Sequence, residues 1–300
     1  MKKGRNLRSV NTDGGVNLQF KLLSAIGIII IVSGHCYHGG MELAYNWFPP
    51  YSYNLALFVF ISGYFYKTDY EENVGKYIWK RTKRLLIPAY LWNIFYGGMV
   101  AFLGLFGFTI GAKPDLYNLF VMPFVDGEAF QYNLGSWFVY PLFLVCIINV
   151  LFRKFLKLIH LDNEFIVLIV YLAIGMIGIN TALENPTAIN GIVKLLVRTM
   201  FFLPCYEFGR FYKAVLEKKD TLNNVAYFAI IFAVQLILLT FCKDLEYTPS
   251  SFTKFNNGFI IPYISSITAI AFWLRVSRLL VPAIGNSKLV RLIADNTYGI

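Results

Sequence analysis

The 300-residue chain is unusually apolar, since 57% of its residues are hydrophobic, 18% are aromatic and only 15% are charged. This composition excludes an ordinary water-soluble domain, whose surface needs more charge. The net charge of +10 does not indicate a nucleic-acid partner, because the basic residues lie between apolar runs and do not form one patch. We therefore predict an all-α, polytopic transmembrane helical bundle that forms a single domain over residues 1–300.

Apolar runs along the chain predict the membrane helices, each of which needs about 20 residues to cross roughly 30 Å of hydrocarbon. In chain order the candidate runs are 18–37, 53–66, 85–108, 136–152, 165–180, 192–211, 225–242 and 259–274. Pro114 and Pro123 interrupt the run 113–124, which predicts an interfacial or re-entrant segment. A ninth run begins around Leu289 and reaches Ile300 before it could cross. We expect about eight to ten membrane helices, the last of them incomplete.

The positions of lysine and arginine orient this bundle, because cytoplasmic loops retain positive charge. Basic residues occupy the N-terminal segment and every second loop, namely 67–84, 153–157, 210–219 and 275–291. The loops between them are mainly acidic. We therefore expect a cytoplasmic N-terminus, a retained first helix and bilayer lipid around the bundle.

His35 is a candidate for chemistry because ionisable groups at membrane depth are costly and therefore usually functional. It lies about 17 residues into the first run, or roughly 25 Å from the cytoplasmic side, in the outer half of the bilayer. An imidazole there could act as a general base on an alcohol. Alternatively, it could be a structural histidine that bonds a helix carbonyl. His38 is on the same helix face and could pair with it.

The pattern does not predict a metal site. His35 and Cys36 are neighbours that diverge on a helix, and no third ligand is spaced to complete a site with His38. The four cysteines lie within or beside apolar runs, so neither a disulfide framework nor a CxxC pattern is visible.

Two groups of basic residues allow a functional and a structural interpretation. Arg81 and Arg84 share one face of the predicted helix, and their guanidinium groups would suit phosphates, although any basic cluster here could also be a cytoplasmic anchor. Lys194 and Arg198 form a second basic face near the outer end of the sixth run, with Glu207 deeper in the same helix. They could extend to outer headgroups or bind an anionic or hydroxyl-rich acceptor.

Four segments, taken in order, resemble the acyltransferase 3 family of bacterial membrane enzymes. Ile28 to His35 is similar to the family's first helix, which ends in a histidine, and Phe58 to Tyr64 is similar to its Phe-rich Ser-Gly-Tyr element. Arg81 to Pro88 and Ser136 to Phe143 resemble its Arg-x-x-Arg-…-Pro and Trp-Phe-Leu motifs. One position departs from the family pattern. Ser24 stands where a basic residue is usual, and Lys21 is the nearest cation.

The resemblance implies a multi-pass enzyme of the bacterial inner membrane that O-acetylates, or otherwise acylates, a hydroxyl of a cell-envelope polysaccharide or a lipid-linked saccharide. The cosubstrate would be a cytoplasmic acyl-CoA, with acetyl-CoA expected first, and no bound cofactor is implied. The acyl group, the acceptor sugar and the oligomeric state are not specified. His35 would be catalytic, either as a base or as a transient acyl carrier. Arg81, Arg84 and Lys21 would bind the donor. The acceptor or cavity residues would be His38, Ser62, Tyr64, Trp137, Lys194, Arg198 and Glu207.

A glycan exporter or secondary transporter is the main alternative, because such proteins also contain broken helices and intramembrane charges. No inverted repeat is visible in the sequence. A purely structural or sensory membrane subunit is a third possibility, but it leaves the order of the four motifs without explanation.

Overall fold

The computed structural model describes residues 12–13, 16–36, 47–108, 111, 113–185, 189–242, 244–247 and 254–296. For residues 12, 13, 16, 35 and 36 it describes the backbone alone. A hairpin of two antiparallel two-residue strands, β1 (Thr12–Asp13) and β2 (Val16–Asn17), precedes a chain of helices. The first helix starts directly after β2.

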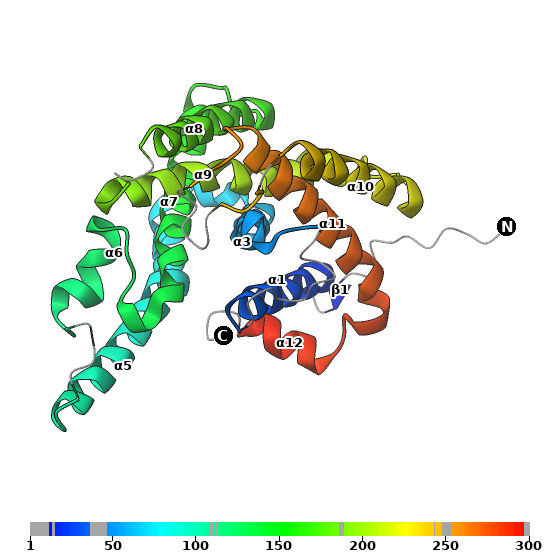
Figure 1. Cartoon of the computed structure of the whole chain (residues 1–300). Coiled ribbons are helices and arrows are strands. Elements are labelled where there is room, and N and C mark those ends of the chain that lie inside the picture. Colours follow the sequence, from blue (N-terminus) through cyan, green and yellow to red (C-terminus); the bar gives the residue numbers. More distant parts are fainter. Residues whose placement is uncertain are drawn as a thin grey trace.

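The helices follow one another along the chain in the arrangement of Figure 1. The α-helices are α1 (Leu18–Cys36), α3 (Asn54–Tyr64), α4 (Val74–Arg81), α5 (Ile87–Gly104), α6 (Met122–Val125), α7 (Val139–Leu158), α8 (Glu164–Glu184), α9 (Gly191–Phe211), α10 (Asn224–Phe241), α11 (Ile261–Ile284) and α12 (Lys288–Asp295). Three π-helical turns are η3 (Thr82–Leu86), η4 (Tyr117–Val121) and η6 (Tyr212–Leu216). The 3₁₀ segments are η1 (Pro50–Ser52), η2 (Thr68–Glu71) and η5 (Gln131–Phe138).

Several of these helices have the length and apolarity of membrane spans. Among the described residues, five segments qualify, namely 74–104, 131–158, 164–184, 224–241 and 261–284, and Leu18–Gly34 and Asn54–Tyr64 are shorter apolar helices. Large apolar side chains on α5 and α10 are exposed, as a lipid-facing surface requires. The predicted all-α transmembrane bundle is confirmed.

Four predicted boundaries were wrong. The run at 85–108 belongs to one helical segment that starts at Val74 and passes through η3, and the run at 136–152 extends over 131–158. The run at 53–66 contains a helix of only 11 residues, and the run at 259–274 continues to Ile284. Hydropathy locates the apolar centre of a span, whereas helical hydrogen bonding continues into polar flanks that carry no apolar signal.

The ninth run does not begin a membrane crossing within the described residues. Residues 288–295 form α12, a short amphipathic helix that packs along α1. Val290 lies against Leu18, Leu22 and Val281, whereas Leu289 and Leu292 are exposed. A helix with one narrow apolar face and basic flanks fits the membrane surface better than the membrane interior.

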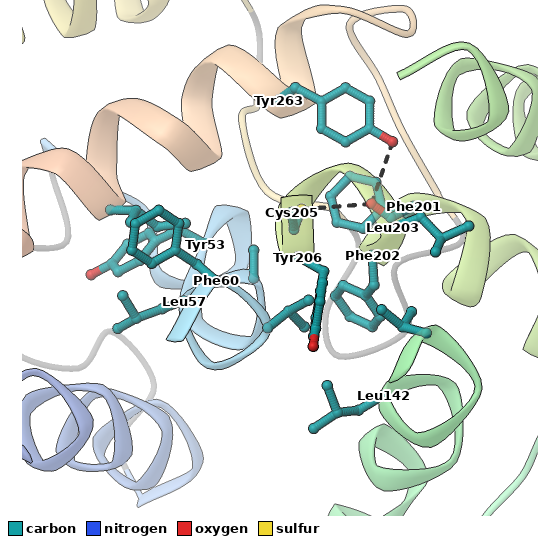
Figure 2. Packing of buried hydrophobic residues seen from close by; sticks show 14 of the residues in the cluster. Tyr53, Leu57, Phe60, Leu142, Phe201, Phe202, Leu203, Cys205, Tyr206 and Tyr263 are labelled. Atoms are coloured by element: carbon teal, nitrogen blue, oxygen red, sulfur yellow. Dashed lines mark hydrogen bonds between the residues drawn. The ribbon is translucent and has the colours of Figure 1, made fainter. Parts of the chain in front are cut away.

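Helix α9 lies at the centre of the bundle and packs against α3, α7 and α8 (Figure 1). The core around it is mainly aromatic. Figure 2 shows Phe202 and Tyr206 of α9 pointing toward Leu142 of α7, whereas Phe201 stacks on Tyr263 of α11. Helices α3 and α9 cross at two glycines. A β-carbon at Gly63 would overlap the Tyr206 carbonyl oxygen, and one at Gly209 would overlap the Phe60 carbonyl oxygen. Glycine at both positions lets the two backbones touch, as is common between membrane helices.

Candidate active site

The last turn of α1 contains His35, as predicted. The Tyr51 hydroxyl donates a hydrogen bond of 3.4 Å to the Gly34 carbonyl, so η1 lies against this end of the helix. The His35 side chain and all of His38 lie outside the described residues. The catalytic role of His35 and the cavity role of His38 therefore stay predictions.

Glu246 joins the same end of the bundle, which the sequence did not reveal. Its carboxylate accepts a hydrogen bond from the Tyr51 backbone N–H. Burial raises the pKa of the Glu246 carboxyl, and the negative charge of Asp244 raises it further. In the sequence Glu246 is one of several acidic loop residues, and only the fold brings it near Gly34 through Tyr51.

Five polar side chains meet deeper in the bundle and form what we call the interior polar cluster. The Ser62 hydroxyl on α3 lies 4.0 Å from the Cys146 thiol on α7. The Arg81 Nε on α4 donates to the Tyr77 hydroxyl at 3.0 Å, and that hydroxyl is 3.5 Å from the Tyr206 hydroxyl on α9. The cluster thus joins four helices and contains two residues, Ser62 and Arg81, that the family resemblance had indicated.

The structure separates the two arginines that the sequence placed on one helix face. Arg81 is partly buried and its guanidinium packs on the Tyr77 ring at 5.1 Å, whereas Arg84 is exposed. The reason is η3, in which each turn holds more residues than an α-helix does. The spacing of three therefore no longer returns to the same face, and the predicted shared face was wrong.

Trp137, Arg198 and Lys194 gather at the opposite end of α7 and α9. The Arg198 guanidinium packs on the Trp137 ring at 4.3 Å and donates to the Gly127 carbonyl at 2.5 Å. Lys194 pairs with Glu128. Gly127 has a φ of +65°, and a side chain there would press on the Gly191 carbonyl. Arg198 is only 3% exposed, so it does not extend to headgroups.

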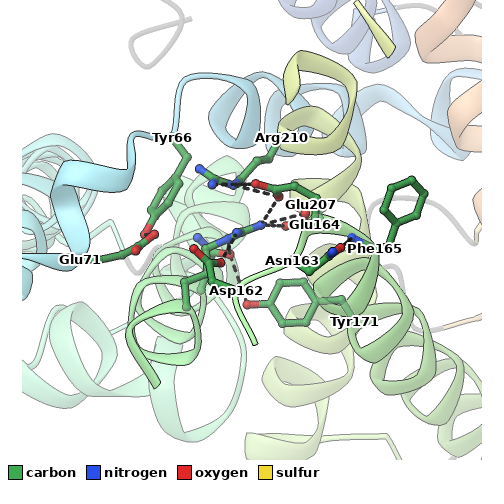
Figure 3. Close-up of polar contacts among 11 residues, drawn as sticks. Tyr66, Glu71, Asp162, Asn163, Glu164, Phe165, Tyr171, Glu207 and Arg210 are labelled. Carbon is green, nitrogen blue, oxygen red and sulfur yellow. Dashed lines mark hydrogen bonds and ion pairs between the residues drawn. The ribbon is translucent and has the colours of Figure 1, made fainter. Parts of the chain in front are cut away.

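Glu207 lies in a different place from Lys194 and Arg198, within a network of ion pairs (Figure 3). Its carboxylate accepts two hydrogen bonds of 2.7 and 2.8 Å from the Arg153 guanidinium, and both side chains are fully buried. Arg153 also contacts Glu164 at 2.7 Å and Asp162 at 3.4 Å, and Arg210 pairs with Glu164 at 2.8 Å. The network joins α7, α8 and α9, and its ion pairs include neither Lys194 nor Arg198.

Glu71 in η2 extends this network toward the loop between α3 and α4. The Tyr66 hydroxyl donates to Glu71 Oε1 at 3.2 Å, and the Arg210 guanidinium lies 5.0 Å from the Tyr66 ring. Glu71 Oε2 is buried without a hydrogen-bond partner among the described residues. Burial raises the pKa of Glu71, and the negative charge of Asp162 adds to that rise.

Lys21 at the start of α1 and Tyr64 at the end of α3 lie apart from the interior polar cluster. They belong to the end of the bundle that carries the basic segments 67–84, 210–219 and 275–291, which we call the basic end. Lys21 pairs with Asp295 of α12 at 2.8 Å. The Tyr64 hydroxyl donates to Glu217 at 2.9 Å, and its ring stacks on Phe20 at 3.8 Å between centroids. Neither contact joins these residues to Arg81, so the structure does not bring the three predicted donor residues Lys21, Arg81 and Arg84 together.

Two levels of polar contacts follow α9. Trp137 and Arg198 form the first, while Tyr206 of the interior polar cluster and the adjacent Glu207, which pairs with Arg153, form the second. The two levels are about 12 Å apart, from eight residues of helical rise. Polar groups are thus available along the interior between the two ends of the bundle.

Sequence reasoning missed Tyr77, Cys146, Arg153 and Tyr206. In the sequence Cys146 is one of four cysteines within or beside apolar runs, and Arg153 belongs to the basic loop 153–157. The sequence alone does not distinguish a tyrosine at the membrane interface from one whose hydroxyl is buried inside the bundle. Among the described residues, no group of three or more His, Cys, Asp or Glu side chains is arranged to hold a metal ion.

Comparison with known proteins decides the family. Residues 17–300 match the acyltransferase 3 family model, described as an acyltransferase domain. The chain belongs to the acyltransferase 3 family. Neither the comparison with curated proteins nor the comparison with solved structures gave a match. Family membership and the apolar helices together make the chain a membrane acyltransferase of multi-pass topology.

Proposed function

We propose that this acyltransferase transfers an acyl group, with acetyl expected first, from a cytoplasmic acyl-CoA to a hydroxyl of a cell-surface or lipid-linked glycan at the bacterial inner membrane. The observation that carries the proposal is the interior polar cluster, in which Arg81 donates to Tyr77, whose hydroxyl faces Tyr206. A cation directed inward from the cytoplasmic side is suited to an anionic donor that enters there.

The reaction requires a base that removes the proton of the acceptor hydroxyl and a path by which the donor thioester reaches that hydroxyl. In the proposed mechanism, His35 takes the proton of the acceptor hydroxyl as that oxygen attacks the thioester carbonyl. The C–S bond then breaks, and the CoA thiolate takes the proton from the imidazolium. One ester forms, one thioester is lost and no oxidant is needed.

Arg81 would hold donor phosphates at the basic end, while the pantetheine arm would extend along the interior past Ser62. Trp137 would line the acceptor side, because its half-buried ring offers stacking to a sugar, and the buried Arg198 guanidinium that packs on the ring would hold it in place. Lys194 would support the same surface through Glu128. Tyr64 and Lys21 would shape the basic end through Glu217 and Asp295.

Mass spectrometry of the cell-surface glycan, from cells with and without the gene, tests this function. We expect one defined acyl mass per repeat unit to disappear with the gene. Purified protein should also hydrolyse acetyl-CoA or transfer its acetyl group to an acceptor. An unchanged acyl content together with a loss of surface glycan would contradict acyl transfer and favour export.

A further inference from the structure

A cavity on the far side of α3 plays no part in the proposed acyl transfer. It has a volume of about 340 Å³ and lies among α3, the end of α9, η6, α10 and α11. Phe60 forms its α3 wall, whereas Ser62 belongs to the interior polar cluster. These two side chains point in roughly opposite directions, because two residues advance a helix by about 200°.

The lining of this cavity is almost entirely apolar. Aromatic rings and aliphatic chains cover it, including Phe208, Phe211, Ile267, Ile270 and Leu274. Such a lining suits a hydrocarbon chain and offers few partners to a nucleotide or a sugar. The size is within the range of pockets that enclose small molecules.

The rim of the cavity is positively charged. Lys219 and Asp220 line it, and Asp220 accepts from Arg275 at 2.6 Å and from Arg278 at 2.8 Å. Asp220 therefore faces two arginines, and Lys219 adds a further positive charge to the lining. Among the described residues no carboxylate forms an ion pair with Lys219.

This rim belongs to the basic end of the bundle, at the predicted level of the inner headgroups. Tyr212 accepts a hydrogen bond of 2.8 Å from Arg278 and lines the cavity below the rim. An apolar cavity under a basic rim matches a phosphate group joined to an acyl chain. We propose that the cavity binds one anionic phospholipid of the inner leaflet, with an acyl chain among the aromatic residues and the phosphate at Lys219.

Native mass spectrometry tests the proposal directly. The purified full chain would be incubated with phosphatidylglycerol or phosphatidylcholine of identical acyl chains, and retained lipid counted after mild delipidation. We expect one phosphatidylglycerol to be retained more strongly than phosphatidylcholine. Ala271→Trp, which fills the cavity, should abolish that retention, while Ala283→Trp on an exposed part of the same helix should not.

A second pair of variants tests the positive charge at the rim of the cavity. Lys219→Gln should weaken phosphatidylglycerol retention by roughly tenfold, as expected for one charge-assisted contact, whereas Lys218→Gln, exposed and outside the lining, should not. Equal retention by Ala271→Trp and the parent would overturn the proposal. Displacement of the lipid by acetyl-CoA would also overturn it, because the cavity would then belong to the donor. Since the readout is bound lipid, the result does not depend on which glycan is acylated.

Discussion

Arginines that the sequence treats alike have different environments in this protein. Arg81 contacts buried tyrosines, Arg84 is exposed, and Arg153, a residue of a basic loop in the sequence, is fully buried. The sequence alone assigns all three to the cytoplasmic side. Of these three arginines, only Arg84 is exposed in the structure.

Replacing Arg81 by Gln should raise the donor KM roughly ten- to a hundredfold, because it removes a charge-assisted phosphate contact of about 1.5–3 kcal/mol. The acceptor KM should change little. Arg84→Gln is the matched control, since the residue lies three positions away and is exposed. Steady-state kinetics with acetyl-CoA measure both constants. Equal effects of the two substitutions on donor KM would show that η3 does not separate their roles.

The pair of Arg153 and Glu207 should stabilise the fold only while both partners are present. Arg153→Met leaves the Glu207 carboxylate buried without its main partner, which typically costs about 3–5 kcal/mol. The double variant Arg153→Met/Glu207→Leu should recover most of that loss, because neither charge then remains. Thermal unfolding in detergent gives the comparison. A double variant that is less stable than Arg153→Met would contradict a purely pairwise role.

At the level of elements, hydropathy located the membrane helices well and their ends poorly. Apolar runs report the hydrocarbon core, so α10 was predicted to within one residue at each end and α8 to within one residue at its start and four at its end. The π turn at η3 could not be predicted, because a face argument assumes 3.6 residues per turn throughout. The ion-pair network also escaped prediction, since residues 54 positions apart carry no local sign that they pair.

The glycine contact between α3 and α9 should control how closely these two helices pack. Gly63→Ala or Gly209→Ala introduces a β-carbon onto a facing carbonyl oxygen, and such overpacking typically costs about 1–3 kcal/mol. Gly98→Ala is the control, because nothing lies within 4 Å of its added β-carbon. The midpoint temperature of unfolding and the rate of donor turnover should both fall for Gly63→Ala and Gly209→Ala. Parental stability in Gly63→Ala would mean that the helices can separate freely.

At the scale of the whole molecule, the charge pattern predicts the orientation of the bundle in the membrane. The N-terminal segment and the loop around Lys76 should face the cytoplasm, because basic segments resist translocation. A cysteine at position 76 should therefore stay unreactive toward an impermeant thiol reagent in intact cells and react after lysis. Labelling in intact cells would show the opposite orientation and would move Arg81 to the outer side.

The whole-molecule account rests on His35 near one end of the interior and on Arg81 near the other. The backbone of α1 places His35 in a helix that packs beside α3, which carries Ser62. Replacing His35 by Gln keeps similar volume and hydrogen bonding while removing a group that can take a proton near pH 7. Loss of a general base typically lowers a rate by about 10² to 10⁴.

The most direct test measures the acyl content of the surface glycan in cells that carry only His35→Gln, with His38→Gln as the matched control. We predict that His35→Gln inserts and accumulates like the parent while the acyl mass disappears, and that His38→Gln retains much of it. Near-parental acylation by the His35→Gln protein would contradict the proposed mechanism.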